Sequence, residues 1–280
     1  MQILSRRSLA FASFAVFQSM RRAVAQSPAE SRGALVKHPR GQYSFLPAIS
    51  AYSSGVVAGD GYEIVHATFS RPHALQEGFK AIDEHLTSLK LPKTALCAAE
   101  LRIPGALSLE AFGAFNTGYI DVLKNWGVLL EGGVNPVART NVAPVANPPS
   151  EPGFHAFSYA MPSTARRKTF VVAGSGEVGD LAKYPGDIIR LGDTSPAGLA
   201  EKARFVLGVM GGRLRALGVT WPAVSTIDVY TAHDLGTRIV GEILKASGHN
   251  AVTWNYARPP ISQIELEMDL RGVAREIVLG

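Results

Sequence analysis

Residues Arg258-Pro-Pro-Ile-Ser-Gln-Ile-Glu-Leu-Glu-Met-Asp269 form the stretch that says most about the fold. Glu265, Glu267 and Asp269 share one face of a strand at a period of two, while apolar residues take the other face. A second stretch, Asn135-Pro-Val-Ala-Arg-Thr-Asn-Val-Ala-Pro144, places Arg139 inside an otherwise buried strand. Because an unpaired buried charge is costly, these charges indicate a polar site. A solvated strand face and a structural ion pair are the simpler alternatives, and the sequence leaves them open.

The same order of elements occurs twice in the sequence. Apolar periodicity, caps and turn residues predict, for the first copy, strands within 52–69 on either side of a turn at 59–61, a helix at 73–90, a strand at 96–103, a helix opened by Ser108, and strands at 137–142 and 154–161. The second copy predicts strands at 169–173, 224–231, 252–256 and 261–270, and helices at 197–217 and from Asp234 to 247. We infer an internal duplication.

This duplication predicts two tandem domains with short connections. We expect an export signal at 1–25, a linker at 26–41, an N-terminal domain at 42–162, a second linker at 163–168 and a C-terminal domain at 169–280.

Composition excludes several classes of protein. The chain has 280 residues, 46% of them hydrophobic and 18% charged, which is globular composition. A single cysteine, Cys97, cannot close an internal disulfide or form a Cys-x-x-Cys metal site, so we expect it in the core. Residues 26–280 hold 24 Lys and Arg against 23 Asp and Glu, so the formal charge of +5 lies almost wholly in the leader. A nearly neutral body does not bind nucleic acid by charge.

The leader has the pattern of an export signal. Paired arginines, Arg6 and Arg7, precede the apolar stretch Leu9–Phe17, and Ala23-Val24-Ala25 fits a cleavage site. Because nine apolar residues cannot cross a bilayer as a helix, we expect no membrane anchor. The expectation is periplasmic location through a twin-arginine signal, with a cytoplasmic protein starting at Met20 as the alternative.

Familiar cofactor and metal motifs are missing or lack their structural setting. Gly174-Ser-Gly-Glu-Val-Gly179 matches Gly-x-Gly-x-x-Gly, but Pro185-Gly186 interrupts the helix that would have to follow. The seven histidines show no close metal-binding pair, and no Gly-x-Ser-x-Gly or P-loop occurs. We therefore expect no cofactor and no bound metal.

Two motifs resemble the Rid family (RidA, formerly YjgF). Val-Ala-Arg-Thr-Asn-Val at 137–142 and Ala-Arg-Pro-Pro-Ile-Ser-Gln-Ile-Glu-Leu-Glu-Met at 257–268 are similar to its Pro-Ala-Arg-Ser strand and its acidic strand. The resemblance implies an α+β, chorismate-mutase-like fold, with two tandem domains that are each a mixed sheet with two helices on one face. It also implies homotrimers with sites in clefts between neighbouring domains.

The resemblance also assigns candidate site residues. In this family an arginine grips the substrate carboxylate and a glutamate positions or activates water; the matching residues here are Arg139 and Glu265. The second copy has Ala251 in place of the arginine, so we expect the two copies to share one cleft. His155 is a second candidate for proton transfer, and the candidates for the pocket wall are Thr140, Asn141, Tyr159 and Tyr256.

The resulting functional hypothesis is hydrolysis of a C–N bond in a small carboxylic acid, either an imine, an enamine or an aminomuconate-type substrate. Two alternatives stay open. One is a chorismatase-like hydrolase or lyase acting on a cyclic or aromatic acid, and the other is a non-enzymatic module that binds small carboxylates.

Overall fold

The computed structural model describes residues 34–248 and 251–280. The expected export signal at 1–25 and the first part of the expected linker at 26–41 lie outside the described residues. Within the described ranges, no helix has both the length and the apolar character needed to cross a bilayer.

The predicted order of elements is confirmed in both halves. The N-terminal half contains β4 (Tyr62–Ala74), α2 (Leu75–Ser88), β5 (Leu96–Arg102), α3 (Leu109–Asn125), β6 (Ala138–Pro144) and β7 (Gly153–Pro162). The C-terminal half repeats this order as β8 (Phe170–Gly176), α4 (Pro196–Ala216), β9 (Thr226–Thr231), α5 (Gly236–Ser247), β10 (Thr253–Arg258) and β11 (Leu266–Gly272). Ser108 caps α3, since its hydroxyl accepts a hydrogen bond from the Ala111 backbone N–H.

The strands of the two halves are joined in one mixed sheet. Its order is β1-β2-β3-β8-β11-β9-β10-β6-β5-β7-β4-β12. The N-terminal half contributes β6-β5-β7-β4 and the C-terminal half contributes β10-β9-β11-β8. In both halves, the third, second, fourth and first strands of the repeat follow one another in the sheet, so the connectivity is the same. Each half also has one parallel pair, β5 with β6 and β9 with β10. The halves meet where β10 pairs antiparallel with β6. This repetition supports the internal duplication.

Each end of the chain adds strands to the opposite half. The segment formed by β1 (Val36–Lys37), β2 (Tyr43–Leu46) and β3 (Gly55–Ala58) joins β8 of the C-terminal half. The last strand, β12 (Arg275–Leu279), runs parallel to β4 of the N-terminal half. The predicted domain boundaries stay a prediction. Toward each edge of the sheet, a strand from one side of the predicted boundary at residues 162–163 pairs with a strand from the other side: β3 with β8, and β12 with β4.

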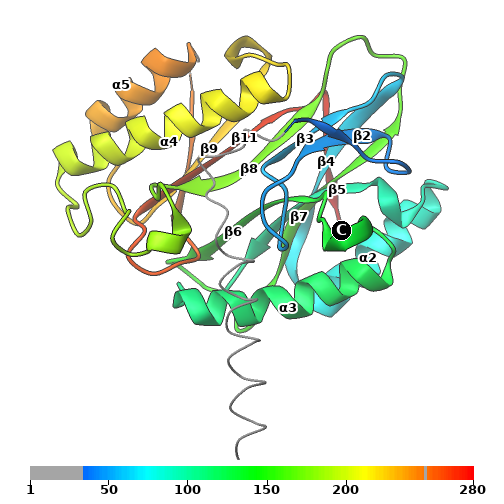
Figure 1. The fold of residues 1–280 in the computed structure, drawn as a ribbon, viewed down its shortest axis with the longest axis horizontal. Helices are drawn as coiled ribbons and strands as arrows, with labels where there is room; N and C mark the ends of the chain where they lie inside the picture. The colour runs from blue at the N-terminus through cyan, green and yellow to red at the C-terminus, as the bar shows by residue number, and fades with distance from the viewer. Residues whose placement is uncertain (1–33, 249–250) are drawn as a thin grey trace, which may run out of the picture.

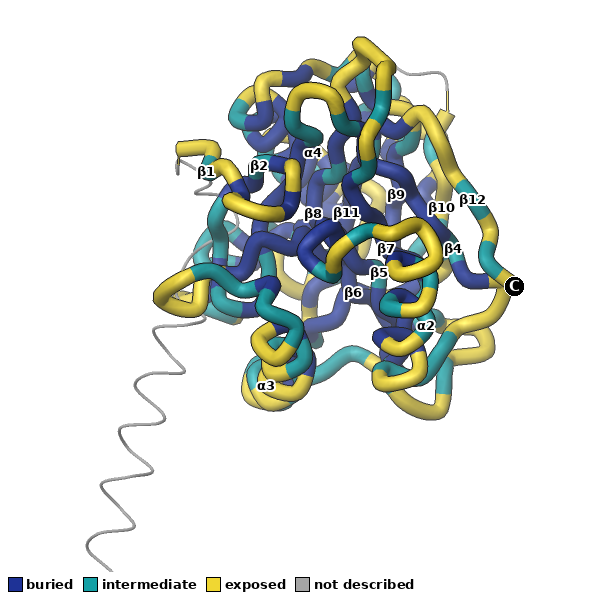
Figure 2. The backbone as a smooth tube through the Cα atoms, turned by 90° about the vertical axis from the view of Figure 1, so that its right-hand side faces the viewer, coloured by how far each residue is buried: buried dark blue, intermediate teal, exposed yellow. Residues whose placement is uncertain are grey.

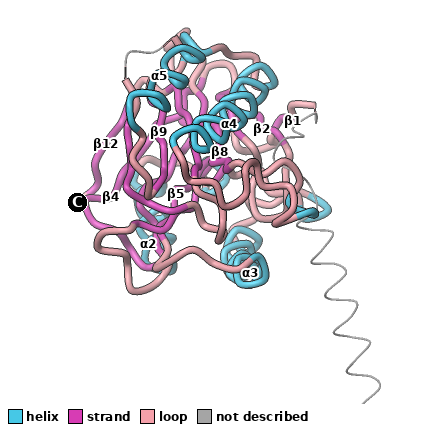
Figure 3. The backbone as a smooth tube through the Cα atoms, turned by 90° about the vertical axis from the view of Figure 1, so that its left-hand side faces the viewer, coloured by secondary structure: helices cyan, strands magenta, loops and turns pink. Residues whose placement is uncertain are grey.

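The molecule has helices on two outer sides and strands between them (Figures 1 and 3). One apolar core lies between α4, α5 and the C-terminal strands, and another between α2, α3 and the N-terminal strands. A third cluster, which contains Phe45, Cys97, Ala138 and Ala173, joins residues of both halves. The central strands are therefore buried on both faces (Figure 2). The expected core position of Cys97 is confirmed, because its side chain is fully buried.

Three local expectations need correction. The last strand of the second copy begins at Leu266 rather than Ile261, because residues 259–265 form a loop that packs Ile261 and Ile264 against Phe112. Helix α5 begins at Gly236, with Leu235 in the cap position, while the Asp234 carboxylate accepts a hydrogen bond from the Gly236 N–H. The sequence analysis also did not predict β1, β2 and β12, which are only two, four and five residues long.

The contact between β12 and β4 leads to a stability prediction. Ile277 packs on the N-terminal core, whereas Val278, the next residue, is 74% exposed. Ile277→Ala should lower the free energy of unfolding by about 1–2 kcal/mol, and the control Val278→Ala by less than about 0.5 kcal/mol. Urea unfolding measures both. Equal losses would contradict the proposed docking of β12.

Candidate functional site

A cavity lies where the two halves meet, near the start of β6 and the end of β8. Its empty space is about 470 Å³ when the open mouth is counted, and the enclosed part is much smaller. The N-terminal half contributes Tyr52, Phe112, Arg139 and Asn141 to its wall. The C-terminal half contributes the rest: Gly174, Ser175, Gly176, Val178, Leu181, Pro260, Ile261, Ile264 and Glu267. The cavity is thus built by both copies of the duplication.

Arg139 on β6 is held rigidly in this wall. Its Nη2 donates a hydrogen bond of 2.6 Å to the Asn116 Oδ1 of α3. Aromatic rings surround the guanidinium, with centroids 4.9–5.7 Å away, and belong to Tyr52, Phe112, Phe115 and Tyr119. Arg139 is buried, yet an arginine keeps its positive charge in a protein. The second nitrogen, Nη1, is left for a ligand.

Several polar atoms of the wall have no hydrogen-bond partner among the described residues. They are Arg139 Nη1, both side-chain polar atoms of Asn141, and Ser175 Oγ. Asn141 lies two residues after Arg139 on the same face of β6, so the amide and the guanidinium point to the same side. Buried polar groups normally find partners, so unsatisfied ones at a cavity wall have hydrogen-bonding capacity for a ligand or water. This set of atoms suits a carboxylate.

Glu267 on β11 provides the acidic group of the cavity. Burial raises the pKa of its carboxyl to about 8, partly opposed by the positive charge of Arg213, while the negative charge of Glu177 raises it further. A Cβ atom at Gly174 would lie 2.0 Å from Glu267 Oε1, so glycine is required for the carboxyl to occupy this position. Glu267 is therefore mostly protonated at neutral pH, with a pKa suited to proton transfer.

Long-range backbone contacts assemble the wall. Leu107, just before α3, pairs with Ile261, because its N–H donates to Pro260 O and its carbonyl accepts from Ser262 N–H. Ser53 pairs in the same way with β6, and this places Tyr52 over Arg139. These bridges connect segments of the chain that the sequence alone does not bring together.

Comparison with known proteins identifies the family. A family model described as 2-aminomuconate deaminase CnbZ matches residues 35–277. The chain belongs to this CnbZ family. The 2-amino-5-chloromuconate deaminase of Comamonas testosteroni is 41% identical over 243 residues, which cover 85% of this chain and 96% of that protein. The Rid-like family membership predicted from the motifs is confirmed.

Solved structures also resemble the CnbZ-family chain. A chorismatase crystal structure aligns with a TM-score of 0.47 and 14% identity, covering 79% of this chain and 77% of that chain. The YjgF gene product of E. coli aligns with a TM-score of 0.28 and 16% identity, covering 38% of this chain and 81% of that chain.

In this CnbZ-family protein the predicted carboxylate-binding residue, Arg139, lies at the cavity, whereas the predicted acid, Glu265, does not. Arg139 and Asn141 lie in the cavity wall, but Glu265 does not line the cavity. Its Oε2 is 2.7 Å from His233 Nε2 and 3.6 Å from Arg258 Nη1, outside β11. Glu265 and Glu267 have the same parity, so alternation alone could not decide which of them faces Arg139. The role of Glu265 stays a prediction, and the geometry favours Glu267.

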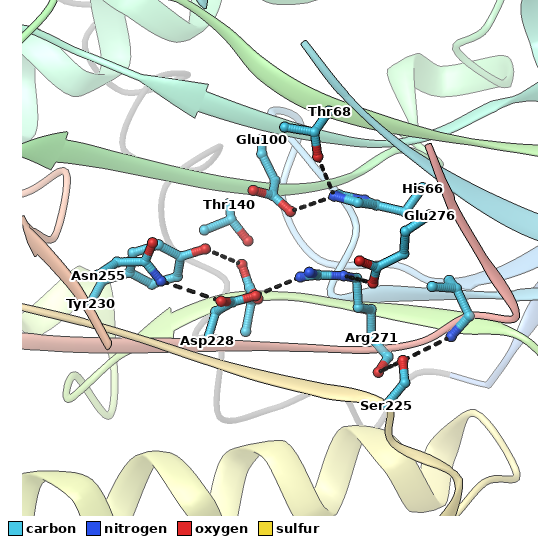
Figure 4. Close-up of polar contacts among 12 residues, drawn as sticks. His66, Thr68, Glu100, Thr140, Ser225, Asp228, Tyr230, Asn255, Arg271 and Glu276 are labelled. Atoms are coloured by element: carbon cyan, nitrogen blue, oxygen red, sulfur yellow. Dashed lines mark hydrogen bonds and ion pairs between the residues drawn. The ribbon is translucent and has the colours of Figure 1, made fainter. Parts of the chain in front are cut away.

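His155 lies near a different polar cluster, since the charges of Arg102, Glu100, His66 and Arg271 act on it. Figure 4 shows this seam cluster, which includes His66, Glu100, Asp228, Arg271 and Glu276. In this seam cluster, His66 Nε2 lies 3.6 Å from Glu100 Oε1, and Arg271 pairs with both Asp228 and Glu276. The pairing of β7 with β5 shifts register at His155, because Glu100 pairs with Ala156 and the next residue, Leu101, pairs with Phe154. The side chain of Phe154 packs in the core. Burial lowers the pKa of His155 to about 4, and the charge of Arg102 adds to the effect.

The other predicted wall residues are absent from the cavity lining. Thr140 points to the opposite face of β6, where its Oγ1 accepts a hydrogen bond of 3.0 Å from the Gly174 N–H and so links the halves. Tyr159 is buried in the core beside His85 and Phe157. Tyr256 is 52% exposed, and its ring contacts Trp254 edge-on. Their predicted substrate contacts are untested, and none of the three lines the cavity.

Sequence reasoning missed Tyr52, Asn116, Ser175 and the role of Glu267. The available signal was the glycine cluster at 174–179, whose glycines allow close approach of Glu267, Ile264 and Asp187 rather than of a dinucleotide. Within the ranges the structure describes, no group of three His, Cys, Asp or Glu side chains could hold a metal ion.

The pKa of Glu267 predicts a pH dependence of stability. The folded protein retains the proton up to about pH 8, whereas the ordinary pKa is 4.5. Between these values the folded state binds more protons than the unfolded state, so stability falls as pH rises through this window. Glu267→Gln should remove this loss, and its melting temperature should gain on wild type between about pH 5 and about pH 9. If the difference in melting temperature between wild type and Glu267→Gln is the same at both pH values, the pKa of Glu267 is not raised.

Proposed function

We propose that this protein hydrolyses the C–N bond of 2-aminomuconate or of a related amino dienoic acid and releases ammonia. The observation that carries the proposal is the set of unsatisfied Arg139 and Asn141 donors facing a cavity that also contains Glu267. The family and the curated relative, a 2-amino-5-chloromuconate deaminase, support the same reaction.

Arg139 and Asn141 bind and orient the substrate in this proposal. A planar carboxylate accepts hydrogen bonds from Arg139 Nη1 and the Asn141 amide, which fixes its plane. The apolar side chains of the wall, among them Val178, Leu181 and Ile264, cover the diene carbons. Arg139 carries the only positive charge among the described residues that line the cavity, so one carboxylate end determines the orientation.

Glu267 moves the protons. Protonated at neutral pH, it donates to a carbon of the diene and converts the enamine into an iminium ion. Its carboxylate then takes a proton from water as the water oxygen bonds to the C=N carbon. The tetrahedral intermediate collapses, the C–N bond breaks, and ammonia and a 2-oxo acid leave.

Kinetics of two variants test these roles. Arg139→Lys keeps a positive charge but loses the planar guanidinium donors, so KM should rise about 10- to 100-fold. Glu267→Gln should lower kcat by about 10²-fold or more, because no proton can be donated. For wild type, kcat should fall above about pH 8 as Glu267 loses its proton. Ammonia release and loss of diene absorbance measure turnover.

Glu265→Gln is the matched comparison, since Glu265 lies two residues from Glu267 and outside the cavity wall. It should retain most of the wild-type kcat. If Glu265→Gln abolishes turnover and Glu267→Gln does not, the assignment of the acid is overturned. Saturable carboxylate binding without ammonia release would favour the non-enzymatic alternative.

We also propose that the protein is exported and assembles as a homotrimer. The paired arginines and the Ala23-Val24-Ala25 site support export, and the Rid resemblance supports trimers. N-terminal sequencing of the native protein should find Gln26 first, and light scattering should give three times the chain mass. A cytoplasmic protein starting at Met20, or a monomer, would contradict the respective proposal.

A further inference from the structure

A buried ion pair lies directly behind the cavity wall. Glu177, just after β8, and Lys202 on α4 are both fully buried, and Lys202 Nζ lies 3.1 Å from Glu177 Oε1. Lys202 Nζ also donates to the Ile189 carbonyl at 2.8 Å, so its charge is well satisfied. Removing two charges from water is costly, and apolar residues of similar size often serve stability as well. The pair therefore needs an explanation beyond stability.

The contacts of Glu177 point toward the catalytic acid. Its Oε1 accepts a hydrogen bond of 2.7 Å from the Glu265 backbone N–H, and its Oε2 accepts one of 3.0 Å from the Leu266 N–H. These two amides belong to the residues immediately before Glu267. Both oxygens of one carboxylate thus hold the backbone from which the Glu267 side chain extends.

The segments on either side of these contacts also line the cavity. Val178 follows Glu177, and Ile264 precedes Glu265. A Cβ atom at Gly176 would lie 2.5 Å from Ile264 Cγ2, so the two segments are in close contact. A displacement of the Glu177 carboxylate would therefore move the cavity wall together with Glu267.

We propose that Glu177, held by Lys202, is a positioning residue that fixes the carboxyl of Glu267 opposite Arg139 without touching the substrate. The inference rests on the proposed function, because it assumes that Glu267 transfers the proton. The charged groups that act on Glu267 are Arg213 of α4, Arg139 of β6, Arg102 of β5 and Glu177 itself. Of these, only the negative charge of Glu177 raises the pKa of Glu267.

Glu177→Gln tests the proposal in the full-length protein. A glutamine side chain has one acceptor oxygen, so it can accept a hydrogen bond from only one of the Glu265 and Leu266 N–H groups, while its NH₂ group would face the other. Because a misplacement of about 1 Å costs up to about 10²-fold in rate, kcat should fall 10- to 100-fold. KM should change less than about threefold, since Arg139 and Asn141 lie on the opposite wall. Because the negative charge of Glu177 raises the pKa of Glu267, its removal should lower that pKa, and kcat should begin to fall at a lower pH than in wild type.

Lys202→Met and the double variant test whether the pair acts as a unit. Each single variant should lower kcat similarly, and the double variant should be no worse than the poorer single variant. The control is Glu242→Gln on α5, whose partly exposed pair with Arg204 lies outside the cavity wall. It should leave kcat and the pH profile unchanged. Additive losses in the double variant would contradict a joint role.

A purely structural role predicts different results. Glu177→Gln would then lower the melting temperature while kcat per folded molecule and the pH profile stay as in wild type, and that outcome would overturn the proposal. An infrared titration of the Glu267 carboxyl, identified by its absence in Glu267→Gln, is independent of turnover. It should show a lower pKa in Glu177→Gln. If wild type releases no ammonia, the proposed function fails, and an unchanged carboxyl pKa in Glu177→Gln would separately refute the positioning role.

Discussion

The site depends on keeping the Glu267 carboxyl out of water in a cavity whose opposite wall carries the Arg139 guanidinium. Burial raises the pKa of Glu267 to about 8, and the positive charges of Arg213 and Arg139 limit the rise. A carboxyl in this balance holds a proton at neutral pH and can still release it. The same burial makes Glu267 unfavourable for stability at high pH, so the fold must hold it in place. Gly174 leaves the space, and Glu177 fixes the backbone before it.

The internal duplication explains why one protein contains both walls. The two halves have the same strand connectivity, but the arginine strand β6 belongs to the first and the acidic strand β11 to the second. The end strands cross between the halves, and Thr140 hydrogen-bonds to Gly174 across the contact. On the matching strand of the second half, β10, Trp254 and Tyr256 are exposed instead. Each half therefore supplies what the other lacks.

Much of the fold follows from the sequence, because strand alternation and helical stripes are local signals. The stripe of α2 buries Phe79, Ile82 and Leu86 as its spacing predicts. The start of β11 was misjudged because Ile261 and Ile264 are apolar in a loop as well as in a strand. Their burial against Phe112 comes from contacts far away in the sequence.

The site was predicted only in part for the same reason. A charged residue within an apolar strand drew attention to Arg139, and the resemblance to the Rid family placed Arg139 and Asn141 among the candidate site residues. The choice between Glu265 and Glu267 depends on where the strand begins, which period-two alternation does not show. Tyr52, Ser175 and Glu177 carry no local signal of function, because their roles arise from tertiary contacts.

The most direct test is a crystal structure with muconate, a dicarboxylate that keeps the diene but lacks the amino group and therefore cannot react. The account predicts one carboxylate bound to Arg139 Nη1 and the Asn141 amide, with the diene between them and the Glu267 carboxyl. Muconate bound beside Glu265 and His233, with Arg139 and Glu267 contacting no ligand, would contradict it.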